Sequence, residues 1–171
     1  MIKPTRSATR PALLLAGEVS DQFAVEHLSE EEAVAAFAPD RAPVAPDVSV
    51  SDLSRQALVA PRHGSTITYV LDEMFAQAGQ TLHLALESGD PFLLRSLAAR
   101  GFACAILPRS VTAWDGPAIE VRSLRPAVRL PVALVWRRAR SASPAARTFI
   151  EFVVQAIGGT APAALTPSRT R

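Results

Sequence analysis

The middle of the chain alternates short apolar runs with segments of helical periodicity, and this alternation restricts the possible folds more than any other feature. Apolar runs at 56–61 and 81–88 are each followed by a segment with apolar residues at helical spacing, at 67–78 and 91–100. A third apolar run, at 102–108, follows the second of these segments. Strands that alternate with helices of this length predict a mostly parallel sheet with crossover helices, and therefore an α/β fold.

The segments on either side of this region predict further elements. Additional strands are expected at 11–17, 23–28, 31–40, 116–124 and 129–138. The periodicity of 31–40 fits a strand or a helix, and the proline-rich connector that follows it favours the strand. A turn at Pro126 is expected to separate the last two strands, and 51–53 is expected to form one helical turn. A final helix is predicted from Pro144 to Gly158, with its apolar residues on one face.

Composition places the chain among folded proteins of one domain or slightly more. It has 171 residues, of which 49% are hydrophobic and 20% are charged, close to ordinary globular usage. No apolar run reaches the roughly 18 residues that span a bilayer, and residues 1–10 lack the apolar stretch of a signal peptide. Cys104 is the single cysteine, so an internal disulfide is excluded. These features predict a cytoplasmic protein in which Cys104 is a small core residue.

The charge distribution argues against a nucleic-acid-binding surface in the middle of the chain. The formal net charge is +2, but residues 1–10 and 158–171 hold five of the basic residues and no acidic one. The remaining 13 basic and 16 acidic residues give a charge near −3 for 11–157. Such a balance does not provide the basic patch that binds phosphates. The two ends are expected to be disordered, solvated segments.

The sequence lacks the common catalytic and cofactor motifs. It contains no GxSxG, GxGxxG, GK[ST] phosphate loop or HExxH, and its histidines, His27, His63 and His83, lie on separate predicted elements. No metal and no cofactor is therefore predicted. A serine near a histidine, Ser65 and His63, raises the hypothesis of a hydrolase, but no acidic residue is placed to orient the histidine. We therefore predict a non-enzymatic protein.

The segment from Arg62 to Thr66 lies between the end of a predicted strand and the start of a helix. In open α/β sheets ligands bind at this position, because the amides and the dipole of the helix start attract anions. Arg62 and His63 add donors there, and Ser65 or Thr66 adds a hydroxyl. The same pattern also describes an ordinary turn with an N-cap, and the sequence does not separate the two interpretations. Loops at 87–90 and 107–109 would lie on the same edge of a parallel sheet.

Several segments, in this order and spacing, resemble a known family. The most informative are Leu94 to Pro108, with the pattern Leu-x-x-x-Ala-Ala-x-Gly and a later Leu-Pro, and Ser-Pro-Ala-Ala-Arg-x-Phe at 143–149. Together with 52–79 and 82–88 they resemble the effector-binding domain of LysR-type transcriptional regulators. The resemblance covers roughly residues 11–156.

The resemblance implies a fold like that of type 2 periplasmic binding proteins, in which two α/β lobes hold a small effector between them. One complete lobe and a fragment of the other are expected. In the mapping that it implies, the chain consists of a disordered start at 1–10, a partial first lobe and crossover at 11–38, a complete second lobe at 39–129, a return crossover and final helix at 130–157, and a disordered tail at 158–171. The winged helix-turn-helix of the family and half of its effector cleft are then absent from this sequence.

The resemblance also implies which residues contact the effector. The expected contacts are Arg62, His63, Gly64, Ser65, Thr66, Ser88, Gly89, Gly101 and Phe102. The implied function is effector sensing, with a small molecule such as a carboxylate as ligand, self-association or pairing with a related regulator, and no direct contact of this chain with DNA or a membrane. The alternative is a stand-alone interaction module that pairs with an intact regulator through apolar faces that the partial lobe leaves uncovered. A periplasmic solute-binding protein shares the fold but would need a signal peptide.

Overall fold

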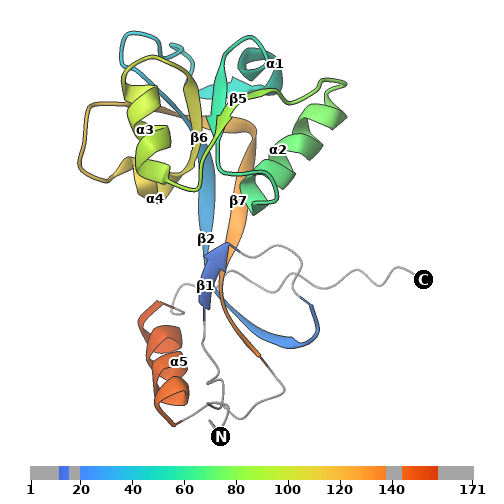
Figure 1. Cartoon of the computed structure of the whole chain (residues 1–171), viewed down its shortest axis with the longest axis vertical. Helices are drawn as coiled ribbons and strands as arrows, with labels where there is room; N and C mark the ends of the chain where they lie inside the picture. Colours follow the sequence, from blue (N-terminus) through green and yellow to red (C-terminus); the bar gives the residue numbers. More distant parts are fainter. Residues whose placement is uncertain (1–11, 16–19, 138–143, 158–171) are drawn as a thin grey trace, which may run out of the picture. The chain divides into compact units, whose positions relative to one another are not determined.

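The computed structural model describes residues 12–15, 20–137 and 144–157, and the chain forms two compact units (Figure 1). Unit 1 consists of Met1–Glu30 and Pro131–Arg171, and unit 2 consists of Glu31–Leu130. The lobe boundaries expected at 38/39 and 129/130 stay a prediction. The expected disordered ends, 1–10 and 158–171, lie outside the described residues.

Unit 2 is built on a mixed sheet with a parallel centre. Its strands are β3 (Asp47–Ser49), β4 (Leu58–Ala60), β5 (Leu84–Glu87), β6 (Cys104–Pro108) and the adjoining parts of β2 (Phe23–Phe37) and β7 (Glu120–Arg137). The order is β7-β2-β6-β4-β5, and β3 also pairs with β7. β4 runs parallel to both β5 and β6, whereas β2 runs antiparallel to β6. The carboxyl ends of β4, β5 and β6 therefore lie at one edge of the sheet.

Two longer and two short helices pack on this sheet. They are α1 (Val50–Leu53), α2 (Thr66–Gln77), α3 (Pro91–Ala99) and α4 (Arg109–Thr112). The expected start of α3 is confirmed, since Asp90 is the N-cap and accepts a hydrogen bond from the Phe92 N–H, with Pro91 at the first helical position. In Figure 1, α2 and α3 lie on opposite sides of the strands. α2 connects the parallel neighbours β4 and β5, whereas α3 connects β5 to β6, which lies on the other side of β4, so the parallel arrangement that the alternation predicts is present.

The core of unit 2 lies between α3 and the central strands. Leu94 and Ala98 of α3 pack with Ala105 and Leu107 of β6, and all four are at most 1% exposed. On α2, the buried apolar residues are Ile67, Leu71, Met74 and Phe75, at the spacing that the sequence shows. Burying each large side chain of this kind contributes roughly 1.5–3 kcal/mol to folding.

Unit 1 contains fewer packed elements among its described residues. β1 (Ala12–Leu15) pairs antiparallel with β7, and Phe23 and Val25 of β2 pack against Ala133 and Val135 of β7. Helix α5 (Pro144–Ile157) has one buried residue, Ala146. Within the described residues, no helix has both the length and the apolar character needed to cross a membrane.

Two expectations about strands are wrong. The strands expected at 23–28 and 31–40 form one strand, β2, and the strands expected on either side of Pro126 form one strand, β7. Both continuous strands pass from one unit to the other. Pro126 is compatible with the strand because β3 pairs only as far as Arg125, and the proline, which has no N–H, is exposed just beyond this point.

Candidate functional site

The loop after β4 is held in a fixed conformation by the first turn of α2. Ser65 is the N-cap, and its Oγ accepts a hydrogen bond of 3.2 Å from the Thr68 N–H. Thr68 is fully buried, and its hydroxyl donates to the Arg62 carbonyl at 3.1 Å. Gly64 has a φ of +84°, a conformation that favours glycine. Gly64, Ser65 and Thr68 therefore each have a structural role in this loop, whether or not the loop binds a ligand.

A second loop, which follows β5, contacts the first. The His63 backbone N–H donates to the Glu87 carboxylate, and the Ser88 N–H donates to the Ala60 carbonyl at 3.1 Å. The Arg62 side chain packs over Gly89, where a Cβ atom would lie 3.6 Å from Nε. The structure therefore brings Arg62–Thr66 together with Ser88 and Gly89, as expected for the carboxyl edge of parallel strands.

Positive and negative groups are mixed around these two loops. The His63 backbone N–H contacts the Glu87 carboxylate, and the His63 Nδ1 atom is 3.9 Å from a carboxylate oxygen of Asp72. The Glu87 carboxylate already accepts one of the loop N–H groups. Attraction of an anion here would depend on directed N–H groups and on the positive end of the α2 dipole rather than on an excess of positive charge.

The local geometry does not support a hydrolase. The Ser65 Oγ contacts Thr68 through both its backbone N–H and its hydroxyl, as an N-cap does. His63 is exposed and faces Asp72, and among the described residues no hydrogen bond joins it to Ser65. The nucleophile-to-base hydrogen bond that this hypothesis requires is missing from the arrangement.

At this edge β6 is followed directly by α4, and the start of α4 is tied to β2 by two glutamates. Arg109 Nε donates to the Glu32 carboxylate at 2.8 Å, and the Ser110 backbone N–H donates to the Glu31 carboxylate at 3.0 Å. Arg109 also donates to the Ser123 hydroxyl at 3.0 Å. The hydrogen bond from Arg109 holds the pKa of Glu32 below its ordinary value. The expected loop at 107–109 is wrong, because 107 and 108 end β6 and Arg109 begins α4. Sequence reasoning also missed both glutamates, which lie on a strand distant in sequence.

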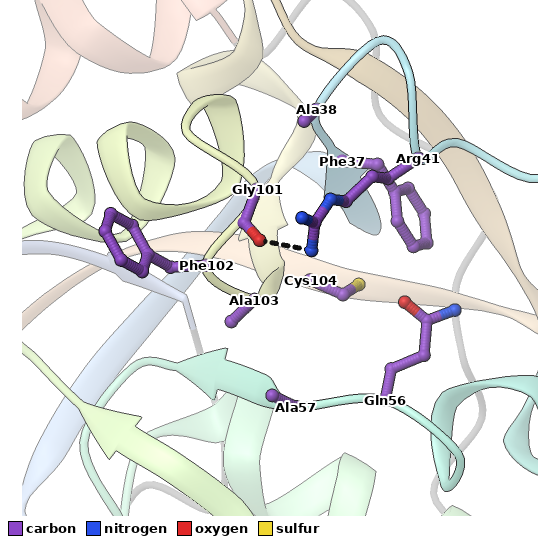
Figure 2. Close-up of a pocket in the computed structure, with 9 residues that line it drawn as sticks. All are labelled: Phe37, Ala38, Arg41, Gln56, Ala57, Gly101, Phe102, Ala103 and Cys104. Carbon is purple, nitrogen blue, oxygen red and sulfur yellow. Dashed lines mark hydrogen bonds between the residues drawn. The ribbon is translucent and has the colours of Figure 1, made fainter.

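Gly101 and Phe102 lie at the other edge of the sheet. Both come just before β6, whose first residue, Cys104, pairs with Leu58 at the start of β4. Since β4 and β6 are parallel, residues before β6 lie far from Arg62, which follows β4. The structure does not bring Gly101 and Phe102 together with the loops at Arg62 and Ser88. They line a pocket of their own, shown in Figure 2.

The described residues contain no group of three or more histidine, cysteine or acidic side chains that could hold a metal ion. His27 is exposed on β2, and His83 is exposed one residue before β5. Cys104 is 2% exposed in the core, as expected, and burial raises the pKa of its thiol. A thiol with a raised pKa is a poor nucleophile and a poor metal ligand.

Known structures share this arrangement of strands and helices. CbnR, a LysR family transcriptional regulator, matches with a TM-score of 0.68 at 18% identity over 86% of this chain and 52% of CbnR. The regulatory domain of CcmR from Synechocystis PCC6803 in complex with 2-PG matches with a TM-score of 0.76 at 12% identity, over 88% of this chain and 74% of that one. The effector-binding domain of QuiR in complex with shikimate matches with a TM-score of 0.74 at 16% identity, over 88% and 72%.

These likenesses establish the fold, and the chain spans about half the length of CbnR. No curated protein matches the sequence. The family model of the LysR substrate binding domain matches residues 12–158, which is most of the chain. The α/β fold like that of type 2 periplasmic binding proteins, expected from the sequence, is thereby confirmed, and the chain belongs to the LysR substrate-binding domain family.

Proposed function

We propose that this chain is the effector-sensing part of a LysR-type regulator and that its effector binds against the loops after β4 and β5. One observation carries this proposal: the contact between the two loops, in which the His63 N–H meets the Glu87 carboxylate and Arg62 covers Gly89. Two loops at the carboxyl edge of parallel strands, one of them at a helix start, form the usual ligand position of an open α/β sheet.

A small molecule with a carboxylate is the effector class that the chemistry favours. A loop N–H already binds a carboxylate of the chain itself, and the Arg62 guanidinium adds donors that suit a planar anion. Two proteins of the same fold were solved with small ligands, 2-PG in CcmR and shikimate in QuiR. Shikimate carries a carboxylate and is therefore a suitable first probe.

Thermal unfolding of the chain with increasing shikimate tests the proposal. A ligand at 100 times its dissociation constant stabilises the folded state by about 2.7 kcal/mol, so a saturable rise of the midpoint is expected. Arg62→Gln should abolish the rise. Arg55→Gln is the matched control, because Arg55 is exposed and lies before β4 at the opposite edge. A rise of equal size in both variants, or none with shikimate, 2-PG or other small carboxylates, would overturn the proposal.

We further propose that DNA contact is not a property of the residues described here. The segment 11–157 carries 13 basic and 16 acidic residues, an unfavourable balance for binding phosphates. The test is fluorescence anisotropy of a labelled duplex with this chain at low salt. Tight binding that weakens steeply with salt would contradict the proposal.

Helix α5 supports a second candidate function, pairing with a related regulator or with another copy. Phe149 is 49% exposed and Phe152 is 68% exposed, and the two lie one helical turn apart on this helix. Large apolar side chains grouped on one surface are typical of contact sites between proteins. Light scattering of the purified chain should show self-association that Phe152→Glu reduces, whereas a monomer at all concentrations would contradict self-association.

A further inference from the structure

Unit 2 contains a pocket at the edge of its sheet opposite to the loops at Arg62 and Ser88. It lies beside the end of β2 and the starts of β4 and β6, and its volume is about 230 Å³. Ligand pockets for drug-sized molecules usually measure about 300–1,000 Å³, so this pocket suits a smaller molecule. All of its lining residues belong to unit 2, so the site is complete within one compact unit.

Arg41 is held across this pocket in a defined position. Its Nη1 donates a 2.7 Å hydrogen bond to the Gly101 carbonyl, drawn as a dashed line in Figure 2. Gly101 has a φ of +69°, and a Cβ there would lie only 2.9 Å from the Arg41 Nε. The glycine thus provides both the turn before β6 and the space in which the guanidinium lies. An arginine fixed in this way loses less conformational entropy when it binds a ligand.

The pocket is lined by the hydrogen-bond donors of Arg41 and Gln56 and by apolar side chains, and its lining includes no acidic side chain. Within the described residues the Gly101 carbonyl is the one acceptor bound by the Arg41 guanidinium, which leaves most of its five N–H groups available. The side-chain amide of Gln56 makes no hydrogen bond to any described residue, and it lies on the opposite side of the pocket from Arg41 in Figure 2. Phe37 and Cys104, each 2% exposed, supply apolar surface at its base.

We propose that this pocket is a second small-molecule site, separate from the loops at Arg62 and Ser88, and that it binds a small monocarboxylate. Arg41 binds the carboxylate, because a guanidinium pairs with a planar carboxylate through two parallel hydrogen bonds. Gln56 donates to the same group. The apolar body of the ligand, about the size of one benzene ring, packs against Phe37 and Ala57.

Benzoate is the probe, and two-dimensional amide NMR of the full chain is the measurement. Saturable shifts are expected at the amides of Gly101, Cys104 and Ala57. Benzamide, which has the same shape without the charge, should bind at least about tenfold more weakly, since charge-assisted hydrogen bonds are roughly twice as strong as neutral ones. Arg41→Gln should abolish the shifts, and Arg62→Gln should leave them unchanged.

A second variant, Ala57→Leu, fills the pocket and keeps Arg41, so it should also abolish binding even if Arg41→Gln alters the local structure. The proposal is overturned if benzoate shifts only the amides of 62–66 and 88–89, if the shifts never saturate, or if they persist in Ala57→Leu. The first of these results would leave the proposed effector site intact. Loss of shikimate binding with retained benzoate shifts would contradict the proposed function alone.

Discussion

The carboxylate of Glu87 accepts a hydrogen bond from the backbone N–H of His63. A carboxylate of the protein itself therefore occupies one N–H group of the loop where we place the effector. Replacing this carboxylate with an amide keeps an acceptor oxygen and removes a negative charge from the site. We therefore expect Glu87→Gln to bind shikimate several-fold more tightly, because like charges within a few ångströms disfavour each other. Isothermal titration calorimetry measures the change.

The matched control for this change is Glu73→Gln on α2. Glu73 also accepts one hydrogen bond, from the Tyr69 hydroxyl at 2.9 Å, but it lies away from the loop. It should leave the affinity within about twofold of the original, given the screening of exposed charges by salt. Weaker binding in Glu87→Gln would show that Glu87 contacts the effector directly and does not repel it.

Ser65 should act on stability through the cap of α2 and on binding through its position in the loop. Ser65→Ala removes the acceptor for the Thr68 N–H and should lower the free energy of unfolding by about 1 kcal/mol. Ser65→Asp restores an N-cap and should keep the stability, while its negative charge weakens binding of shikimate. Urea unfolding gives the first quantity and calorimetry the second. Equal affinities in Ser65→Asp and the original chain would place the effector elsewhere.

The fold of unit 2 was predictable because its signals are local. Apolar periodicity and stop residues located β4, α2, β5, α3 and β6, and the pair Asp90 and Pro91 gave the start of α3. Each of these features depends on residues a few positions apart, which the sequence displays directly. The rule that parallel strands end at one edge then placed Arg62 near Gly89.

The continuity of β2 and β7 could not be predicted in the same way. Their polar and proline-containing middle segments, near Glu30 and Pro126, have the composition of turns. The strands on which they lie are neighbours in the sheet although they are distant in sequence, and both pair further along with other distant strands, β2 with β6 and β7 with β3. Pairing partners of this kind depend on the whole sheet, and the local pattern does not contain them.

The candidate site was predicted in part. The loops at Arg62 and Ser88 meet as expected, but Gly101, which the family resemblance places with them, precedes its strand rather than following it. Parallel strands have their starts at one edge of the sheet and their ends at the other. This rule alone places Gly101, which precedes β6, at the edge opposite to Arg62 and Ser88. The contact of Glu87 with His63 had no signal in the sequence, because a carboxylate 24 residues away can adopt many positions before the sheet is assembled.

The pair of Arg109 and Glu32 should make stability depend on pH. Arg109 lowers the pKa of Glu32 from its ordinary value of 4.5, so the folded state binds a proton less readily than the unfolded chain. The contribution is complete above the unfolded pKa and is lost as the pH falls through the folded pKa. Glu32→Gln should therefore show a smaller loss of unfolding free energy than the original chain below about pH 4.5. Urea unfolding at several pH values measures the difference.

Arg109→Met should reduce the pH dependence of the unfolding free energy to the same extent as Glu32→Gln. The double variant should reduce it no further, because both single changes remove the same interaction. The Glu32 side chain is 22% exposed and that of Arg109 is 47% exposed, so salt should reduce the effect. Parallel pH profiles for the original chain and Glu32→Gln would contradict the assignment of the low pKa to this pair.

Arg95 should destabilise unit 2, since it is a buried cation whose Nε has no hydrogen-bond partner in the part of the chain that the structure describes. It is 6% exposed on α3, and a Cβ atom at Gly116 would collide with its Nη1, so the loop at Gly116 passes directly over the guanidinium. A buried polar group without a partner costs about 1–3 kcal/mol. Arg95→Met keeps most of the volume and should raise the free energy of unfolding by about 1 kcal/mol, as measured in urea. Arg95→Lys, which keeps the charge, should give no gain, and a large loss in Arg95→Met would mean that the guanidinium is paired in solution.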